Sequence, residues 1–263
     1  MPGVIERHTT AIKSGARGVD GYRMSRVSVI VPAHNEQRYL PACLASIHHA
    51  ARSIECDVEI VVVANRCTDA TEVIARSAGA VVIANQSRSI SAVRNAGAAR
   101  STGEILVTLD ADSRMSPKAL GEIERHLSTG AYIGGGSTFM PERHSIGIDL
   151  TMAMVRFSMS VSGLSGAMYW CRRGDWEAIG GFNESLVMAE DLDFARRLRE
   201  YGRRSGRKFI SLHTAPVVTS CRKFDQYGDW HMFGMLRQMR EVRASMAGDD
   251  RTFVDRYFYD VTR

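Results

Sequence analysis

Two aspartates, Asp110 and Asp112, stand two positions apart directly after the apolar run at residues 105–109. Residues i and i+2 of an extended chain point to the same side, so the two carboxylates converge. Paired carboxylate oxygens suit Mg²⁺ or Mn²⁺, which complete their coordination with water and phosphate oxygens. A solvated loop is the alternative for so short a motif, but its position at the end of an apolar run favours a metal site.

A second acidic pair, Glu190 and Asp191, begins a stretch of helical periodicity that extends to Tyr201, and Gly202 is expected to end this helix. Carboxylates at this position interact favourably with the helix dipole and can cap free N–H groups. Capping needs only one acid, and a carboxylate held near an acceptor hydroxyl can also act as a general base. Both a capping role and a catalytic role are therefore open for this pair.

The spacing of apolar residues predicts the elements that position these acids. Four short apolar runs alternate with stretches of helical periodicity, at residues 27–31, 58–63, 80–83 and 105–109. Short continuous apolar strands between helices are typical of an α/β protein with a parallel sheet covered on both faces. Ligands bind at the carboxyl ends of such strands. The expected site is therefore formed by the loops at residues 32–36, 64–69 and 110–112.

The second half of the chain is less regular. Residues 117–127 have helical periodicity, and residues 210–212 indicate a late strand. Residues 151–170 are rich in Met and Ser, which predicts either core helix and loop, because Met fills gaps, or a surface for an apolar or lipid-linked acceptor. We expect a loosely ordered N-terminal arm at residues 1–25 and a C-terminal helical extension at residues 222–263.

The composition excludes several classes of protein. Apolar residues make up 44% and charged residues 24% of the 263 residues, as in globular domains that need no disulfide framework. The five cysteines are widely spaced and form no CxxC motif, which favours reduced thiols in a cytoplasmic protein.

The net charge of +5 favours anionic partners, but no Lys/Arg block is long enough to predict a nucleic-acid partner. No apolar run approaches the ~20 residues of a spanning helix. We therefore expect no transmembrane span, and at most peripheral contact with the inner face of a membrane.

Six motifs occur in a specific order: PAHNE (32–36), ANRCTD (64–69), SAVRNAGAARSTGE (91–104), LDADS (109–113), GGFNE (180–184) and AEDLDFARRL (189–198). Over about residues 27–220 the chain resembles the family 2 glycosyltransferases with the GT-A fold. The resemblance implies a mostly parallel central sheet flanked by helices. It also implies a catalytic domain at residues 26–221, with a nucleotide-binding half (26–113) and an acceptor half (114–221).

Members of this family move a sugar from a nucleotide-diphosphate sugar to an acceptor hydroxyl, usually with inversion. For this chain both a lipid-linked and a small-molecule acceptor stay open. The resemblance implies donor-binding roles for matching positions. The nucleoside would contact Pro32, Asn35 and Glu36. The base would lie over Asn65 and Asp69, and the donor phosphates would lie near Arg94. The acids matching Asp110 and Asp112 would hold ribose and metal, with Asp112 the more direct metal ligand. Asp191 would act as the base, with Glu190 beside it.

The chain departs from the family pattern at Asn65, where an Asp is common. An amide both accepts and donates hydrogen bonds but carries no charge, so UDP-linked and GDP-linked donors are both admissible. His213 follows the late strand and is a candidate metal ligand, with a structural histidine as the alternative. Arg222 is a candidate cation for the donor diphosphate.

Three other functions compete with sugar transfer. A sugar-nucleotide nucleotidyltransferase would carry a Gly-rich basic loop after the first strand, where this chain has residues 32–36. A Rossmann oxidoreductase would carry GxGxxG at the same place. A non-catalytic nucleotide-sugar-binding or scaffolding protein of the same fold is disfavoured by the intact acids Asp110, Asp112, Glu190 and Asp191, although Asn65 keeps it open.

Overall fold

The structure is a computed structural model, and it describes residues 26–162, 164 and 167–235. The expected N-terminal arm and residues 236–263 of the expected C-terminal extension lie outside the described residues. In the described part the strands form one sheet in the order β3-β2-β1-β4-β7-β6-β8-β5. The strands are β1 (Arg26–Ala33), β2 (Asp57–Asn65), β3 (Val81–Asn85), β4 (Ile105–Thr108), β5 (Ser113–Arg114), β6 (Tyr132–Pro141), β7 (Ala167–Arg172) and β8 (Lys208–Thr219).

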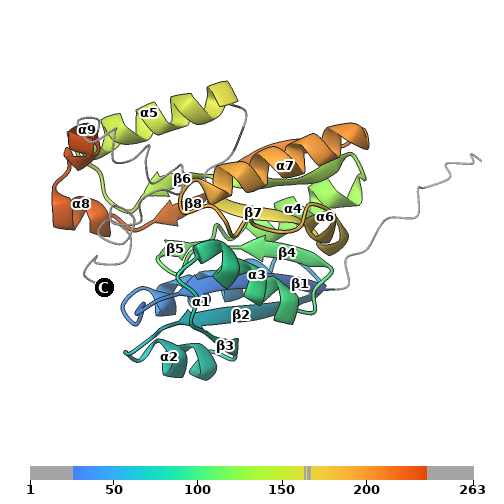
Figure 1. The fold of residues 1–263 in the computed structure, drawn as a ribbon, viewed down its shortest axis with the longest axis horizontal. Coiled ribbons are helices and arrows are strands. Elements are labelled where there is room, and N and C mark those ends of the chain that lie inside the picture. Colours follow the sequence, from blue (N-terminus) through green and yellow to red (C-terminus); the bar gives the residue numbers. More distant parts are fainter. Residues whose placement is uncertain (1–25, 163, 165–166, 236–263) are drawn as a thin grey trace, which may run out of the picture.

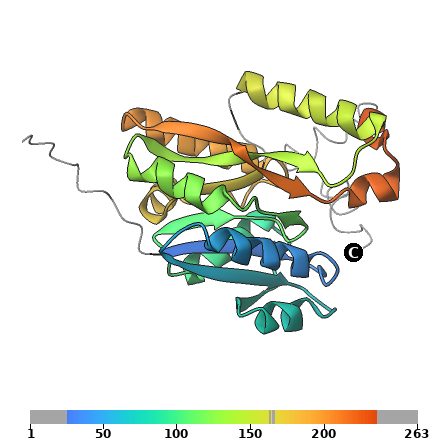
Figure 2. The ribbon, with the colours of Figure 1, turned by 180° about the vertical axis from the view of Figure 1, so that it is seen from behind.

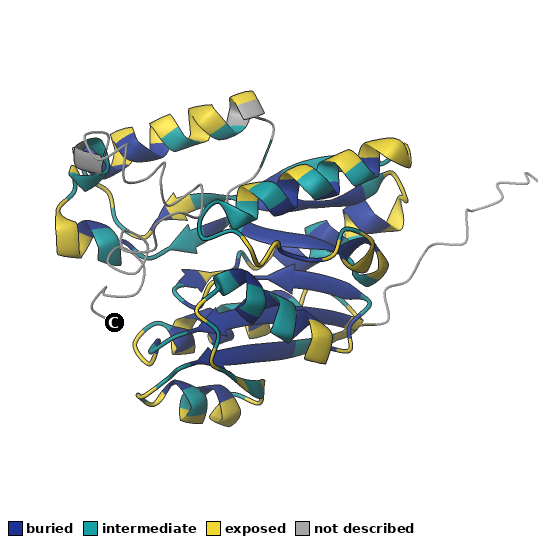
Figure 3. Ribbon diagram, viewed as in Figure 1, coloured by how far each residue is buried: buried dark blue, intermediate teal, exposed yellow. Residues whose placement is uncertain are grey.

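Helices flank this sheet, and Figure 1 shows their arrangement. They are α1 (Leu40–Ala51), α2 (Thr71–Ser77), α3 (Ile90–Arg100), α4 (Ala119–Ser128), α5 (Ile146–Ser162), α6 (Arg173–Ala178), α7 (Glu190–Arg204), α8 (Arg222–Tyr227) and α9 (His231–Met235). Figure 3 shows that buried residues concentrate in the sheet and in the inner faces of the helices. The exposed residues lie mainly on the outer helix faces and in the loops.

The first four strands of the sheet, β1 to β4, pair in parallel. Both faces of β1 are buried, because Val29 packs in the cluster that includes α1 while Ile30 packs in the cluster that includes α3. A Cβ at Gly97 of α3 would lie 2.4 Å from Ile30 Cγ2 and 2.9 Å from Val63 Cγ2. A glycine at this position therefore lets α3 approach the sheet, as the continuous apolar strands predict.

The other half of the sheet is mixed. β7 runs antiparallel to both β4 and β6, β6 runs parallel to β8, and β5 runs antiparallel to β8. The predicted α/β fold is confirmed, and most of its parallel pairing lies in β1 to β4. Sequence analysis missed β7, since residues 151–170 were expected to form helix and loop, and instead hold most of α5 and the start of β7.

Helix α7 begins at Glu190, as predicted, but it continues past Gly202 to Arg204. A Cβ at position 202 would lie 2.7 Å from Ile133 Cγ2 and 2.9 Å from the carbonyl oxygen of Arg207. This glycine therefore permits close packing of α7 on β6 and does not end the helix.

Candidate active site

The loops after β1 and β2 lie side by side at the carboxyl end of the sheet and are joined by hydrogen bonds. Asn35 Oδ1 accepts from the N–H of Thr68 at 2.8 Å, and the N–H of Glu36 donates to Thr71 Oγ1 at 2.7 Å. Asp69 accepts from the N–H of Thr71 at 3.0 Å. Burial would raise the pKa of Asp69, but its hydrogen bonds outweigh burial and hold that pKa below its usual value. The two loops therefore form a single connected surface.

Asn65 is buried at the end of β2, and its amide nitrogen is used within the protein. Nδ2 donates to the carbonyl oxygen of Ser87 at 2.8 Å and lies 3.2–3.3 Å from two oxygens of Asn85. A carboxylate here would face these oxygen atoms without a proton to share, which explains why an amide replaces the acid. Asn65 Oδ1 accepts from Arg66 Nε at 3.4 Å.

Arg94 of α3 joins two of the predicted acids. Its Nη2 lies 2.9 Å from Asp110 Oδ1, and its Nη1 lies 2.8 Å from Glu190 Oε1. The guanidinium carbon is 5.1 Å from the centroid of the Phe182 ring. Arg94 is buried and thus ties the end of β4 to the start of α7, although these segments are far apart in the sequence.

Arg222, the first residue of α8, joins two other predicted acids. Its Nη1 lies 2.7 and 2.9 Å from the two carboxylate oxygens of Glu36, and its Nη2 lies 3.0 Å from Asp112 Oδ2. Ser220 Oγ donates to the same Asp112 oxygen at 2.8 Å. The ring of Tyr39 lies beneath the guanidinium, with 5.6 Å between the guanidinium carbon and the ring centroid. Sequence analysis did not single out Ser220 or Tyr39, and neither forms part of a recognisable motif.

Asp191 lies in the first turn of α7, after Ala189, whose φ of 58° lies in the left-handed region. Its Oδ1 accepts from the N–H of Leu192 at 2.8 Å. Burial and the adjacent Glu190 charge raise the pKa of Asp191 to about 6, against the opposing effect of Arg94. A carboxyl group with a pKa near neutrality is well matched to general-base catalysis.

The GGFNE motif connects to α3 through Asn95. The amide nitrogen of Asn95 donates to the carbonyl oxygen of Phe182 and to Glu184 Oε1, each at 2.9 Å, and its amide oxygen accepts from the N–H of Phe182. Gly181 has a φ of 64°, and a Cβ there would lie 2.6 Å from Asn95 Oδ1. The motif therefore holds Phe182 against Arg94 and fixes the position of the chain segment that leads to Glu190 and Asp191 on α7.

Two predicted site residues are not brought to these acids. Pro32, which was expected to contact the nucleoside, is buried within β1. His213 is exposed on β8, and its neighbour Leu212 pairs with Ser137 of β6. Thr219, which lies at the end of β8 near Asp112, pairs four residues farther along β6. At the usual strand rise these two points are roughly 13 Å apart. A metal–nitrogen bond is only ~2 Å long, so the structure does not place His213 with Asp112.

The remaining acids suit a divalent cation that arrives with a diphosphate. Two guanidinium groups pair with four carboxylates, those of Glu36, Asp110, Asp112 and Glu190. Asp191 adds a fifth carboxylate next to Glu190, which leaves a net charge of three negative. Among the described residues no group of three or more His, Cys, Asp or Glu could alone hold a metal ion. Mg²⁺ is commonly held by one or two carboxylates with substrate phosphates, so this donor set fits.

The two guanidinium groups retain unused donors. The Nε atoms of Arg94 and Arg222 are both buried and have no hydrogen-bond partner. Buried polar groups are usually hydrogen-bonded, and phosphate oxygens are strong acceptors for guanidinium N–H groups. The site therefore combines carboxylates for a cation with arginines for a phosphate.

Two family models match the chain. The model described as glycosyl transferase family 2 matches residues 28–158, and the one described as glycosyl transferase family group 2 matches residues 105–241. The second of these covers more than half of the chain. The chain belongs to the family 2 glycosyltransferases. This membership agrees with the resemblance that its motifs implied.

Individual relatives are distant. An undecaprenyl-phosphate 4-deoxy-4-formamido-L-arabinose transferase of Pseudomonas fluorescens is 28% identical over 121 residues, which is 43% of this chain and 36% of that protein. Glycosyltransferase AglE of Haloferax volcanii is 26% identical over 222 residues, 77% of this chain and 68% of that protein. The chain thus spans about a third of the first of these relatives.

Solved structures of GT-A glycosyltransferases share the fold. The mannosyltransferase PcManGT of Pyrobaculum calidifontis, in complex with GDP-Man and Mn²⁺, has a TM-score of 0.58 and 21% identity, covering 75% of this chain and 57% of that one. Glucosyl-3-phosphoglycerate synthase of Mycobacterium tuberculosis, in complex with Mn²⁺, UDP and phosphoglyceric acid, has a TM-score of 0.56 and 19% identity, covering 87% and 80%. At these identities the likeness establishes the fold alone.

Proposed function

We propose that this glycosyltransferase moves a sugar from a UDP- or GDP-linked donor to an acceptor hydroxyl with inversion, and that Asp191 is the general base. The observation that supports this most strongly is the position of Asp191 at the start of α7, next to Glu190, which Arg94 links to Asp110. Burial at this position raises the pKa of Asp191 to about 6. At pH 7 such a carboxyl is mostly ionised, so it can accept the proton of an attacking hydroxyl. A single base is sufficient for an inverting displacement.

The donor would lie along the carboxyl ends of β1, β2 and β4. The nucleoside would contact the connected loop surface formed by Asn35, Glu36 and Asp69, with Asn65 supporting that surface from below. Asp110 and Asp112 would hold Mg²⁺ or Mn²⁺, which when bound neutralises charge on the departing diphosphate. Arg94 and Arg222 would stabilise the same charge through guanidinium donors, and Glu190 would hold Arg94 in place beside Asp191.

The acceptor is proposed to be lipid-linked and presented at the inner face of a membrane. The relatives named undecaprenyl-phosphate transferases support a lipid acceptor, and the charge of +5 suits an anionic surface. No helix among the described residues is long and apolar enough to cross a bilayer. Contact with the membrane would then be peripheral, in the cytoplasm.

The test is calorimetric binding of UDP, GDP and their sugar conjugates, with and without Mn²⁺, followed by transfer assays. We expect Mn²⁺-dependent binding of one nucleotide, lost in Asp112→Ala and retained in Asp57→Ala, since Asp57 lies at the opposite end of β2 and is exposed.

Asp191→Asn should bind donor normally but turn over about 10²–10⁴-fold more slowly, the usual contribution of a general base. Asp57→Asn, the same change at an exposed acid at the opposite end of β2, serves as its control. Full transfer by Asp191→Asn would disprove the base assignment. If the folded protein bound no nucleotide with metal present, a non-catalytic role would replace the proposed one.

A further inference from the structure

Helix α5 is unusual because it is apolar on two opposite sides. Among its 17 residues only Asp149 and Arg156 carry a charge. A helix of a soluble protein normally has one apolar side, and a helix that is apolar all round is covered by protein or lipid. One apolar side of α5 is accounted for, since Ile148 and Met152 pack with Cys221 and Phe224 in a small core cluster.

The second apolar side of α5 is exposed. It is formed by residues at spacings of four, four, three and four, which places them within an arc of about 80° on a helix. Its members and their exposed fractions are Ile146 (80%), Leu150 (49%), Met154 (40%), Phe157 (73%) and Val161 (75%). Singly exposed apolar residues are ordinary, but a continuous stripe along a whole helix marks a binding surface. We call these five residues the α5 stripe.

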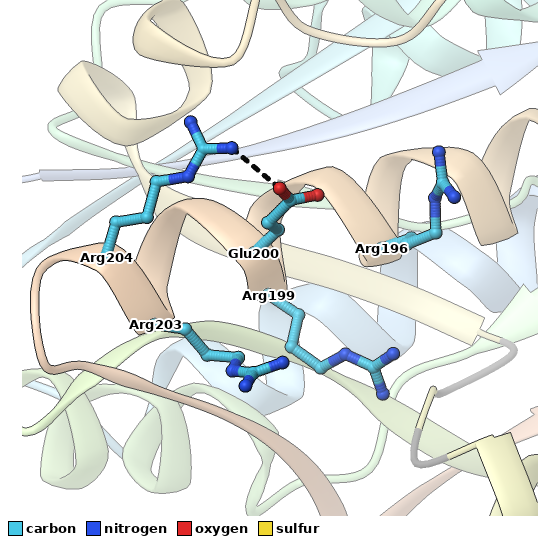
Figure 4. Close-up of a pocket in the computed structure, with 5 residues that line it drawn as sticks. All are labelled: Arg196, Arg199, Glu200, Arg203 and Arg204. Carbon is cyan, nitrogen blue, oxygen red and sulfur yellow. Dashed lines mark hydrogen bonds and ion pairs between the residues drawn. The ribbon is translucent and has the colours of Figure 1, made fainter.

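The outer face of α7 carries a cluster of positive charge. Figure 4 shows Arg196, Arg199, Arg203 and Arg204 around Glu200, where they line an open hollow of about 430 Å³. Arg204 forms an ion pair with Glu200, at 2.6 Å. These four arginines, the α7 arginine cluster, leave a strong positive charge on this face.

The helices that carry the α5 stripe and the α7 arginine cluster lie along the same edge of the molecule. Both helices lie along the upper edge in Figure 1, and they keep this position in Figure 2, in which the molecule is turned about the vertical axis. Both also connect to the site. Helix α7 begins at Glu190, and the inner side of α5 packs on Cys221, the neighbour of Arg222.

We propose that this edge binds the surface of a bilayer containing anionic lipids. The α5 stripe would lie at the boundary between headgroups and acyl chains, and the α7 arginine cluster would contact lipid phosphates. Interfacial helices bind in this way, through buried apolar area together with attraction between basic residues and anionic lipids.

The charge of this edge argues against a second copy of the chain as the occupant. A two-fold pairing would bring two α7 arginine clusters to one interface, whereas anionic headgroups complement them. The inference deepens the proposed function by locating the membrane contact next to the acceptor side of the site. Binding to lipid does not itself require transfer.

The test is sedimentation of the full chain with large unilamellar vesicles, without donor or metal. Vesicles of phosphatidylcholine with one-third phosphatidylglycerol should bind the protein, and vesicles of phosphatidylcholine alone should bind it far more weakly. Phe157→Ser should weaken binding about tenfold, the effect of losing one buried aromatic side chain. Arg199→Glu with Arg203→Glu should weaken it by at least as much and reduce its dependence on salt.

Matched controls are available on α2, at the opposite edge of the molecule. Val73 is 66% exposed, so Val73→Ser removes a comparable exposed apolar side chain, and Arg76→Glu reverses a comparable exposed charge. Neither should change vesicle binding.

Three results would overturn the proposal. The first is equal binding to neutral and anionic vesicles, or none to either. The second is an unfolding temperature that falls in Phe157→Ser, which would show that residues 236–263 or another part of the chain covers the stripe. The third is a dimer in light scattering that Phe157→Ser dissociates. None of these results bears on nucleotide binding, so the proposed function is tested separately.

Discussion

Arg94 and Arg222 each bridge two carboxylates of the site, and the two bridges differ in how far the paired aspartate stays exposed to solvent. Beside Arg94, the side chain of Asp110 stays 57% exposed, whereas beside Arg222 that of Asp112 is only 15% exposed. Asp112 Oδ2 accepts from both Arg222 and Ser220. A ligand can therefore reach Asp110 without breaking an ion pair, but a cation can use the full carboxylate of Asp112 only after Arg222 withdraws.

This difference indicates that Arg94 keeps its carboxylate partners permanently, whereas Arg222 can exchange one of its partners. Arg94 comes from a helix packed on the sheet and joins two halves of the fold, so its bridge belongs to the architecture. Arg222 follows β8 and closes over Asp112, where a metal is expected to bind. We expect that Arg222 exchanges Asp112 for the donor diphosphate when the metal arrives, which would couple the binding of the two ligands.

The largest expected effect comes from removing the permanent bridge. Arg94→Ala should lower the free energy of unfolding by about 3–5 kcal/mol, because it leaves acids of the cluster without their cation. Urea denaturation at pH 7 measures this. Arg76→Ala, at an exposed ion pair with Glu72, should cost no more than about 1 kcal/mol. A loss below 1 kcal/mol in Arg94→Ala would contradict an architectural role.

A smaller effect is expected at the exchangeable bridge. Arg222→Gln should tighten Mn²⁺ binding in the absence of nucleotide by roughly tenfold, because Asp112 no longer has a competing cation. The same variant should bind the nucleotide with Mn²⁺ more weakly, because it lacks a charge for the diphosphate. Calorimetric titrations of metal alone and of nucleotide with metal distinguish the two effects. Unchanged affinity for metal alone would show that Arg222 does not compete with the metal for Asp112.

The smallest effect concerns the pKa of Asp191 and its dependence on the neighbouring Glu190. Since Asp191 must be ionised to accept a proton, kcat/KM should fall as the pH drops through about 6. Glu190→Gln removes a negative charge that raises the pKa of Asp191, so this acid limb should move to lower pH by about one unit. Glu200→Gln should leave the limb in place. An unmoved limb in Glu190→Gln would assign it to a different group.

Much of the N-terminal half of the fold could be predicted because its strands are buried on both faces. Such strands appear as continuous apolar runs, and four of these runs correspond to β1 to β4. The second half was less predictable, since β7 follows the Met-rich α5 closely and its apolar pattern does not reveal that it runs antiparallel to β4. The prediction that Gly202 ends α7 was wrong, because glycine is typical both of a helix end and of a close contact such as that with Ile133.

The site acids, Arg94 and Arg222 were identifiable from their motifs, but their partners were not. Glu36 and Arg222 are 186 positions apart, and no local pattern indicates that they form an ion pair. His213 illustrates the opposite case, because a plausible residue type near a late strand lies too far along β8 to join Asp112. The exposed α5 stripe was likewise visible only as an apolar segment until the structure showed which side is covered.

The sequence by itself determined the family, the parallel strands and the acids available for chemistry, since these depend on residue type and spacing along the chain. Only the tertiary structure decided which arginine neutralises which acid, which oxygens the amide of Asn65 donates to, and which side of α5 faces outward. These properties depend on distances between segments remote in sequence. Burial and neighbouring charge, which raise the pKa of Asp191 to about 6, exist only once those segments have packed together.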